Sequence, residues 1–126
     1  PRPYYNSQLS TPDGDDWQGK GPAPGHPCID APLSCDGREG WLLEMLGGSF
    51  TVLNFGNPEE ALLADVDVKA VAMPRGGLAA ERYGACDGAT YLVRPDQVVA
   101  ARWKAATALD ITSALKTALA QERKQA

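Results

Sequence analysis

The segment between Tyr91 and Trp103 constrains the fold of this chain most, because two β-rich runs flank a short turn there. The runs are rich in β-branched and other apolar residues, and Pro95-Asp-Gln97 separates them. A loop this short joins antiparallel neighbours, and proline sets the backbone angle that a turn needs. The sequence therefore predicts a hairpin with strands over residues 90–94 and 98–103.

A strand, a helix and a second strand are predicted upstream of the hairpin. Residues 49–55 are β-branched and aromatic on both faces, which is typical of a buried strand. Asn57-Pro-Glu-Glu60 has a capping residue, a first-turn proline and two acids, so we expect a helix to start there. Residues 67–73 alternate at period two. A short helical crossover between such strands predicts a parallel, right-handed unit.

Three further helical segments are predicted: a turn at residues 41–46, another at 78–82, and a C-terminal helix over 111–119 capped by Asp110. The apolar stripe of the last helix consists of Ile111, Ala114, Leu115, Ala118 and Leu119. The element order is β-α-β followed by β-β-α. That order predicts an α/β protein of the thioredoxin-like fold, with a mixed four-stranded sheet and flanking helices.

Residues 1–27 are predicted to form a Pro/Gly-rich arm or interdomain linker, with the folded domain over residues 28–126. Tyr4, Tyr5 and Trp17 are large aromatics in this polar segment. They suit packing onto a surface, either of this domain or of a preceding one. Asp13-Gly-Asp-Asp16 lacks the ligand spacing of a calcium loop, so we expect a solvated acidic turn there.

Composition indicates a globular protein and excludes several kinds of partner. The apolar fraction is 44% and the charged fraction 22%, both ordinary values. The net charge is −4 and the basic residues are scattered, so no nucleic-acid partner is expected. No apolar run approaches the roughly 20 residues of a membrane helix, and Pro1-Arg-Pro-Tyr-Tyr5 is not a signal peptide. We expect a cytoplasmic protein without a membrane partner.

Cys28, Cys35 and Cys86 form no C-x-x-C pair, so reduced thiols are predicted, although a Cys28–Cys35 bridge stays open on spacing alone. The redox cysteines of a thioredoxin-like fold would follow the first strand, where Gly56-Asn-Pro-Glu-Glu60 stands instead. Carboxylates there would raise the pKa of a neighbouring thiol. His26 is the single histidine and gives neither a triad nor a metal cluster. We therefore predict no catalytic residue, metal or cofactor in this chain.

The ends of the hairpin carry the best candidates for a contact site. Arg94 and Arg102 could face each other or reach a carboxylate such as Asp96. One reading is a salt bridge within the turn. The other is a contact with a neighbouring domain or subunit, for which Trp103 would be an apolar anchor.

The sequence also resembles a known family over residues 22–119. The most specific part is Leu92-Val-Arg-Pro-Asp96 with Arg102-Trp103, joined by Trp41-Leu-Leu-Glu-Met-Leu-Gly-Gly48 and Tyr83-Gly84. These motifs are similar to the C-terminal domain of flavin-dependent aromatic hydroxylases of the phenol and 3-(3-hydroxyphenyl)propionate type. Gln97 stands where that family more often has glycine.

The resemblance implies a non-catalytic domain of a larger enzyme. Its parent would use FAD and NAD(P)H to insert one oxygen atom of O2 into an aromatic ring. The flavin site and the substrate site would lie in N-terminal domains of the same polypeptide. The domain would then act in packing or in a homo-oligomer. Two alternatives remain: a free-standing thioredoxin-like module that binds a ligand or protein, and a thiol-dependent redox protein that would need a reactive Cys86.

Overall fold

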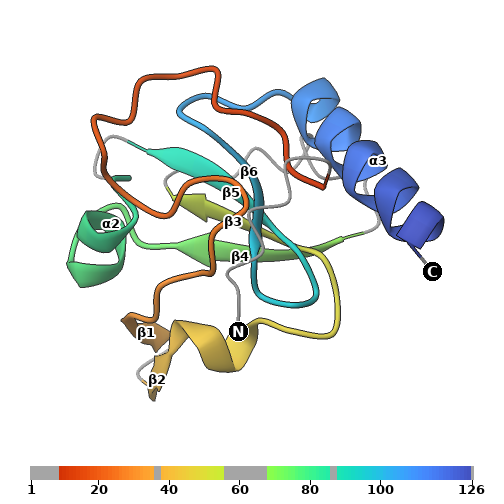
Figure 1. Ribbon diagram of the computed structural model, residues 1–126. Helices are drawn as coiled ribbons and strands as arrows, with labels where there is room; N and C mark the ends of the chain where they lie inside the picture. Colours follow the sequence, from red (N-terminus) through yellow and green to blue (C-terminus); the bar gives the residue numbers. More distant parts are fainter. Residues whose placement is uncertain (1–8, 36–37, 56–67, 86–87, 126) are drawn as a thin grey trace.

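A mixed four-stranded sheet, in the order β4-β3-β5-β6, forms the centre of the computed structural model (Figure 1). The structure describes residues 9–35, 38–55, 68–85 and 88–125. In chain order the elements are β1 (Pro32–Cys35), β2 (Arg38–Trp41), the 3-10 helix η1 (Leu42–Met45), β3 (Thr51–Phe55), β4 (Lys69–Met73), α2 (Leu78–Arg82), β5 (Ala89–Val93), β6 (Val99–Trp103) and α3 (Ala108–Gln125). The described residues therefore make a small α/β domain.

The strand pairing confirms the predicted sheet. β3 pairs with β4 in parallel, from Thr51 opposite Lys69 to Phe55 opposite Met73. β5 pairs antiparallel with β3 and with β6, so the predicted hairpin is present. The predicted helix from Asn57, and with it the handedness of the crossover, lies outside the described residues.

The alternation of side chains along the strands divides the core into two clusters. One face of the sheet contributes Leu53, Phe55, Val71, Met73, Tyr91, Val93 and Val99, which pack with residues of α2, η1 and β1. The other face contributes Val52, Leu92, Ala100 and Ala101, which pack under Ile111 and Ala114 of α3. Figure 1 shows α3 and α2 on opposite sides of the sheet. In the described part of the chain, no helix is both long and apolar enough to cross a membrane.

The C-terminal helix starts earlier than predicted, and the prediction that Asp110 caps it from outside was wrong. α3 begins at Ala108, so Asp110 is its third residue. The backbone N–H of Asp110 donates to Thr107 Oγ1 at 3.1 Å, and the N–H of Thr107 donates to Asp110 Oδ2 at 2.9 Å. This reciprocal pair is a capping box, in which an acid inside the first turn completes a Thr cap.

A separate two-stranded ribbon, β1 paired with β2, was not predicted. Its strands are antiparallel, with Pro32 opposite Trp41 and Cys35 opposite Arg38. Leu33 of β1 is buried in the first core cluster. η1 follows β2 directly and confirms the predicted helical turn at residues 41–46.

Candidate functional site around Arg102 and the docked segment

Arg102 lies on β6 and is the most heavily bonded charged side chain among the described residues. It is only 5% exposed. Its Nε and Nη2 donate to the two carboxylate oxygens of Asp13 at 2.9 and 2.7 Å, and its Nη1 donates to the Lys20 carbonyl at 2.8 Å. The segment that these bonds hold, residues 9–27, is called the arm below. Arg102 therefore ties the arm to the hairpin.

Burial and hydrogen bonding act on the Arg102 guanidinium in opposite directions. Burial disfavours its charge, but hydrogen bonds to Asp13 and to Tyr91 outweigh that effect, so its pKa is raised above the ordinary value. Two parallel N–H bonds to one carboxylate also fix the orientation of both groups. The planar fork of arginine is required here, because lysine cannot donate in this pattern.

Trp17 supplies the apolar part of the same contact. It is buried, and its ring lies 4.3 Å from the guanidinium carbon of Arg102 and 5.2 Å from Lys104 Nζ. Its ring also meets Tyr91 edge to face, with centroids 5.6 Å apart. Trp17 thus packs into this domain, one of the two surfaces that the sequence left open.

The arm also covers the outer edge of β6 with backbone hydrogen bonds. The N–H groups of Thr11 and Gly25 donate to the carbonyls of Ala100 and Val99, both at 2.8 Å, and Val99 N–H donates to the His26 carbonyl at 2.9 Å. Figure 1 shows the arm, in red and orange, passing from beside α3 across to the α2 side. An uncovered edge strand is a template for pairing with other chains, so the arm protects this edge.

The sequence predicts a solvated acidic turn in the arm, and its carboxylates are exposed but also hydrogen-bonded. Asp15 accepts a hydrogen bond from the backbone N–H of Lys104 at 2.9 Å, and Asp16 accepts one from Gln18 at 2.9 Å. With Asp13 bound to Arg102, all three carboxylates have partners within the domain. Asp13 and Asp15 dock the arm on β6 and the residue after it, whereas Asp16 bonds within the arm itself.

Two buried tyrosines extend the network into the core. Tyr91 Oη donates to the Tyr83 carbonyl at 2.6 Å, and Tyr83 Oη donates to the Ile29 carbonyl at 2.6 Å. Burial raises the pKa of Tyr91 to about 12 and also raises that of Tyr83. Gly21 of the arm lies against both residues, and an added Cβ there would lie 2.6 Å from the Tyr83 carbonyl oxygen. The close approach of arm and core therefore depends on a glycine at this position.

The two arginines of the predicted contact site have separate partners. Arg94 pairs with Asp96 in the hairpin turn, so the predicted salt bridge within the turn is present. Trp103 is partly buried against the second core cluster. Tyr4 and Tyr5 lie outside the described residues. A role for any of these residues in an interdomain or subunit contact stays a prediction.

Gln97, which stands where the family more often has glycine, lies in the hairpin turn. Gln97 has a positive φ of 67°, a conformation that costs a residue with a side chain more than it costs glycine. Its side-chain amide lies 3.5 Å from the Leu46 carbonyl, at the limit of a hydrogen bond. The turn thus keeps its geometry without glycine.

The described residues provide neither a reactive thiol nor a cluster of metal ligands. Cys28 is a free thiol, and burial raises its pKa to about 12, so it stays protonated at neutral pH. Cys86 and the Cys35 side chain lie outside what the structure describes, as does Asn57-Pro-Glu-Glu60. The residues that are described contain no group of three or more His, Cys, Asp or Glu side chains placed to hold a metal.

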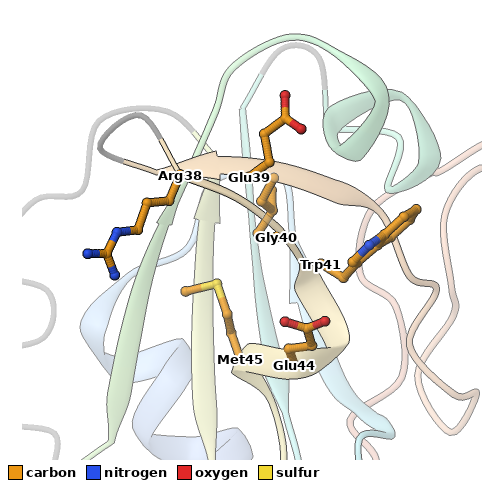
Figure 2. Close-up of a pocket in the computed structure, with 7 residues that line it drawn as sticks. Arg38, Glu39, Gly40, Trp41, Glu44 and Met45 are labelled. Atoms are coloured by element: carbon orange, nitrogen blue, oxygen red, sulfur yellow. The ribbon is translucent and has the colours of Figure 1, made fainter.

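A surface hollow over the β1–β2 ribbon was not predicted from the sequence. It has a volume of about 570 Å³ and is lined by Leu33, Arg38, Glu39, Gly40, Trp41, Glu44 and Met45. Figure 2 shows Trp41 and Arg38 at opposite ends of β2, with Glu44 and Met45 of η1 below them. A second hollow of about 540 Å³ shares most of this lining and adds Pro32 and Ser34.

Comparison with solved structures defines the class of protein that has this fold. No protein-family model matches the sequence, and no curated protein matches it significantly. The fold is that of the C-terminal domain of FAD-dependent aromatic hydroxylases, which confirms the resemblance found in the sequence.

Three of these structures illustrate the similarity. Aklavinone-11 hydroxylase, in a ternary complex with FAD and aklavinone, matches with a TM-score of 0.72 and 24% identity, over 93% of this chain and 26% of that chain. The flavin-dependent monooxygenase PieE, in complex with FAD and substrate, has a TM-score of 0.64 and 20% identity, over 93% and 24%. The rebeccamycin biosynthetic enzyme RebC has a TM-score of 0.62 and 21% identity, over 91% and 22%. This chain thus spans about a quarter of their length.

Proposed function

We propose that this chain is the C-terminal domain of an FAD- and NAD(P)H-dependent aromatic-ring monooxygenase and has a structural, non-catalytic role there. The domain is thioredoxin-like and extends over residues 28–126, with the arm docked on it. It packs against the FAD and substrate domains of the same cytoplasmic polypeptide or in a homo-oligomer. The parent enzyme hydroxylates an aromatic compound, in catabolism or a related pathway.

The observation that carries this proposal is the extent of the match. More than nine-tenths of this chain aligns with about a quarter of aklavinone-11 hydroxylase, so the likeness is to a whole domain of a larger enzyme. Domains of that size have their own core and are joined to others by short linkers. Because this chain has the fold of that C-terminal domain, we expect it to be the C-terminal domain of a larger enzyme as well.

The polar network supports a structural role. Arg102, Asp13 and Tyr91 bond to one another or to the backbone of the domain. Groups that act on a substrate need a free face toward it, whereas Arg102 and Tyr91 are buried between the arm and the sheet. Their chemistry is used to hold the arm.

A free-standing module that binds a ligand or protein is the alternative. The surface hollow over the β1–β2 ribbon is the observation that favours it. The space between the hairpin and α3, by contrast, is filled by the second core cluster. The thiol-dependent alternative would need a reactive Cys86, which lies outside the described residues, and the Cys28 thiol that the structure does describe is held protonated.

The mass of the native product tests the proposal. An antibody against this domain is used to detect the protein in lysate of the source cell, and the captured protein is examined for flavin absorbance. We expect a product of roughly 60 kDa, the mass of this domain with two further domains of ordinary size, that carries FAD. A product of 13.4 kDa without flavin would overturn the proposal and favour the binding module.

A further inference from the structure

The outer face of the β1–β2 ribbon is open in this domain. Residues that lie opposite each other in the register, and those two apart, share a face, so Pro32, Ser34, Glu39 and Trp41 lie together. All four are exposed. We call these four residues together with Glu44 of η1 the ribbon face.

The burial of the ribbon is one-sided. Leu33 packs into the core, but none of the four residues of β2 is buried. A two-stranded ribbon is marginally stable in water unless a face is packed. Half of the ribbon therefore lacks the apolar contact that strands of this kind usually have.

Two exposed large apolar side chains lie on or next to the ribbon. Trp41 of β2 is 49% exposed, and Ile29, shortly before β1, is 41% exposed. Ile29 contacts Tyr83 at the end of α2, and Arg82 of α2 donates to the Asp30 carbonyl at 2.9 Å, so these residues border β1. Large exposed apolar residues next to a hollow are typical of a protein contact surface.

The negative charge of the ribbon face indicates a partner surface that carries positive charge. Glu39 and Glu44 are its charged residues, and both line the second hollow beside Trp41. Two carboxylates that line one hollow with an exposed indole suit an arginine or lysine, which can pair with an acid and stack on the ring. A second copy of this chain that presents the same face is a poor occupant, because Glu39 and Glu44 are the charged residues of that face and it would offer them no cation.

We infer that the ribbon face docks on a basic, apolar surface of the polypeptide that precedes this domain in the full-length protein. This inference rests on the proposed function. The matched hydroxylases have about three-quarters of their chain outside the matched domain, so a large surface is present to cover the ribbon face. Burial of Trp41 beside a cation would make it the central residue of the contact.

Hydroxyl-radical labelling read by mass spectrometry tests the inference. Labelling of Trp41 and Met45 is compared between the 126-residue chain, once it shows a cooperative thermal transition, and the native-length protein. We expect a several-fold loss of labelling at both residues in the native-length protein. Leu109 on α3, 74% exposed, is the internal control and should keep its labelling.

Substitutions of Glu44 in the native-length protein test the charge of the partner. Glu44→Gln should restore part of the Trp41 labelling and Glu44→Lys more of it, because the cation opposite is first unpaired and then repelled. Equal labelling of Trp41 in both proteins, or protection that appears in the 126-residue chain as it dimerises, would overturn the inference. A native product of 13.4 kDa would instead overturn the proposed function.

Discussion

Arg102 combines more interactions than any other described charged side chain, and their value is testable by one substitution. Arg102→Met keeps much of the length and apolar volume but removes the donors to Asp13 and to the Lys20 carbonyl. Removing one partner of a buried ion pair costs about 3 to 5 kcal/mol. We expect the lower end of this range, because water can reach the partly exposed Asp13 carboxylate once Arg102 is gone. Chemical denaturation should therefore show a free energy of unfolding lowered by about 3 kcal/mol.

The matched control for this substitution is Arg38→Met, because Arg38 is exposed on the β1–β2 ribbon. A surface charge of this kind contributes roughly 0 to 1 kcal/mol. If both variants unfold at the same denaturant concentration, Arg102 does not hold the arm in the way described.

Alanine substitutions at Gly21 and Gly19 distinguish the energetic cost of a steric overlap from the cost of a left-handed backbone conformation. Both have a positive φ, of 70° and 73°. An added Cβ at Gly21 would overlap Tyr91 Oη and the Tyr83 carbonyl, whereas at Gly19 it meets nothing within 4 Å. We expect Gly19→Ala to cost about 1 kcal/mol for the left-handed backbone alone, and Gly21→Ala about 3 kcal/mol or more. Equal losses in denaturant titrations would contradict the close approach.

The buried thiol of Cys28 should make the domain less stable at alkaline pH. Its pKa is raised from 9.0 to about 12 in the folded state. Between these values the unfolded chain releases the thiol proton and the folded chain keeps it, so the free energy of unfolding falls as pH rises. Cys28→Ala should flatten this fall from pH 9 upward when thermal unfolding is followed from pH 7 to 11. An unchanged slope would mean that the thiol is hydrated.

At the scale of elements, the start of α3 depends on a reciprocal cap. Thr107→Ala removes the side-chain acceptor for the Asp110 N–H and should lower the free energy of unfolding by about 1 kcal/mol. Thr117→Ala, on the exposed side of the same helix, is the control and should be neutral or slightly stabilising, since alanine is the better helix former. Circular dichroism during thermal unfolding distinguishes the two.

The elements that were predictable are those defined by local pattern. β3, β4 and the β5–β6 hairpin follow from β-branched runs and alternation, and their order gives the mixed sheet. The β1–β2 ribbon was missed because its strands are short and contain no Val, Ile or Thr, although Asp36-Gly37 between them is a turn signal. The first residue of α3 was missed because a Thr cap and an acid three residues later were read as one acidic cap.

The candidate site could not be read from local pattern, because its partners are far apart in the chain. Asp13 and Arg102 are separated by 89 residues. Spacing within the sequence suggested Asp96 as a partner of Arg102, and Asp96 in fact binds Arg94. Trp17 indicated that the arm packs on a surface but not on which one, and the proline and glycine content of the arm is equally typical of a linker.

For the whole molecule, the packing of the arm predicts where the chain can be shortened. Removal of residues 1–8 leaves every described contact of the arm. Removal of residues 1–27 takes away Trp17, the Asp13 carboxylate and the backbone bonds to β6. It thereby exposes the edge of β6 and leaves the Arg102 charge unpaired inside the protein.

We therefore expect a chain of residues 9–126 to unfold cooperatively at the same temperature as the full sequence, because it keeps the core intact. A chain of residues 28–126 should instead lose its cooperative transition or self-associate through β6. Near-ultraviolet circular dichroism during heating, with sedimentation velocity for association, measures both outcomes. If residues 28–126 form a monomer with the same midpoint, the arm is a linker that only rests on the domain. If they do not, the folded unit includes the arm from Leu9 onward.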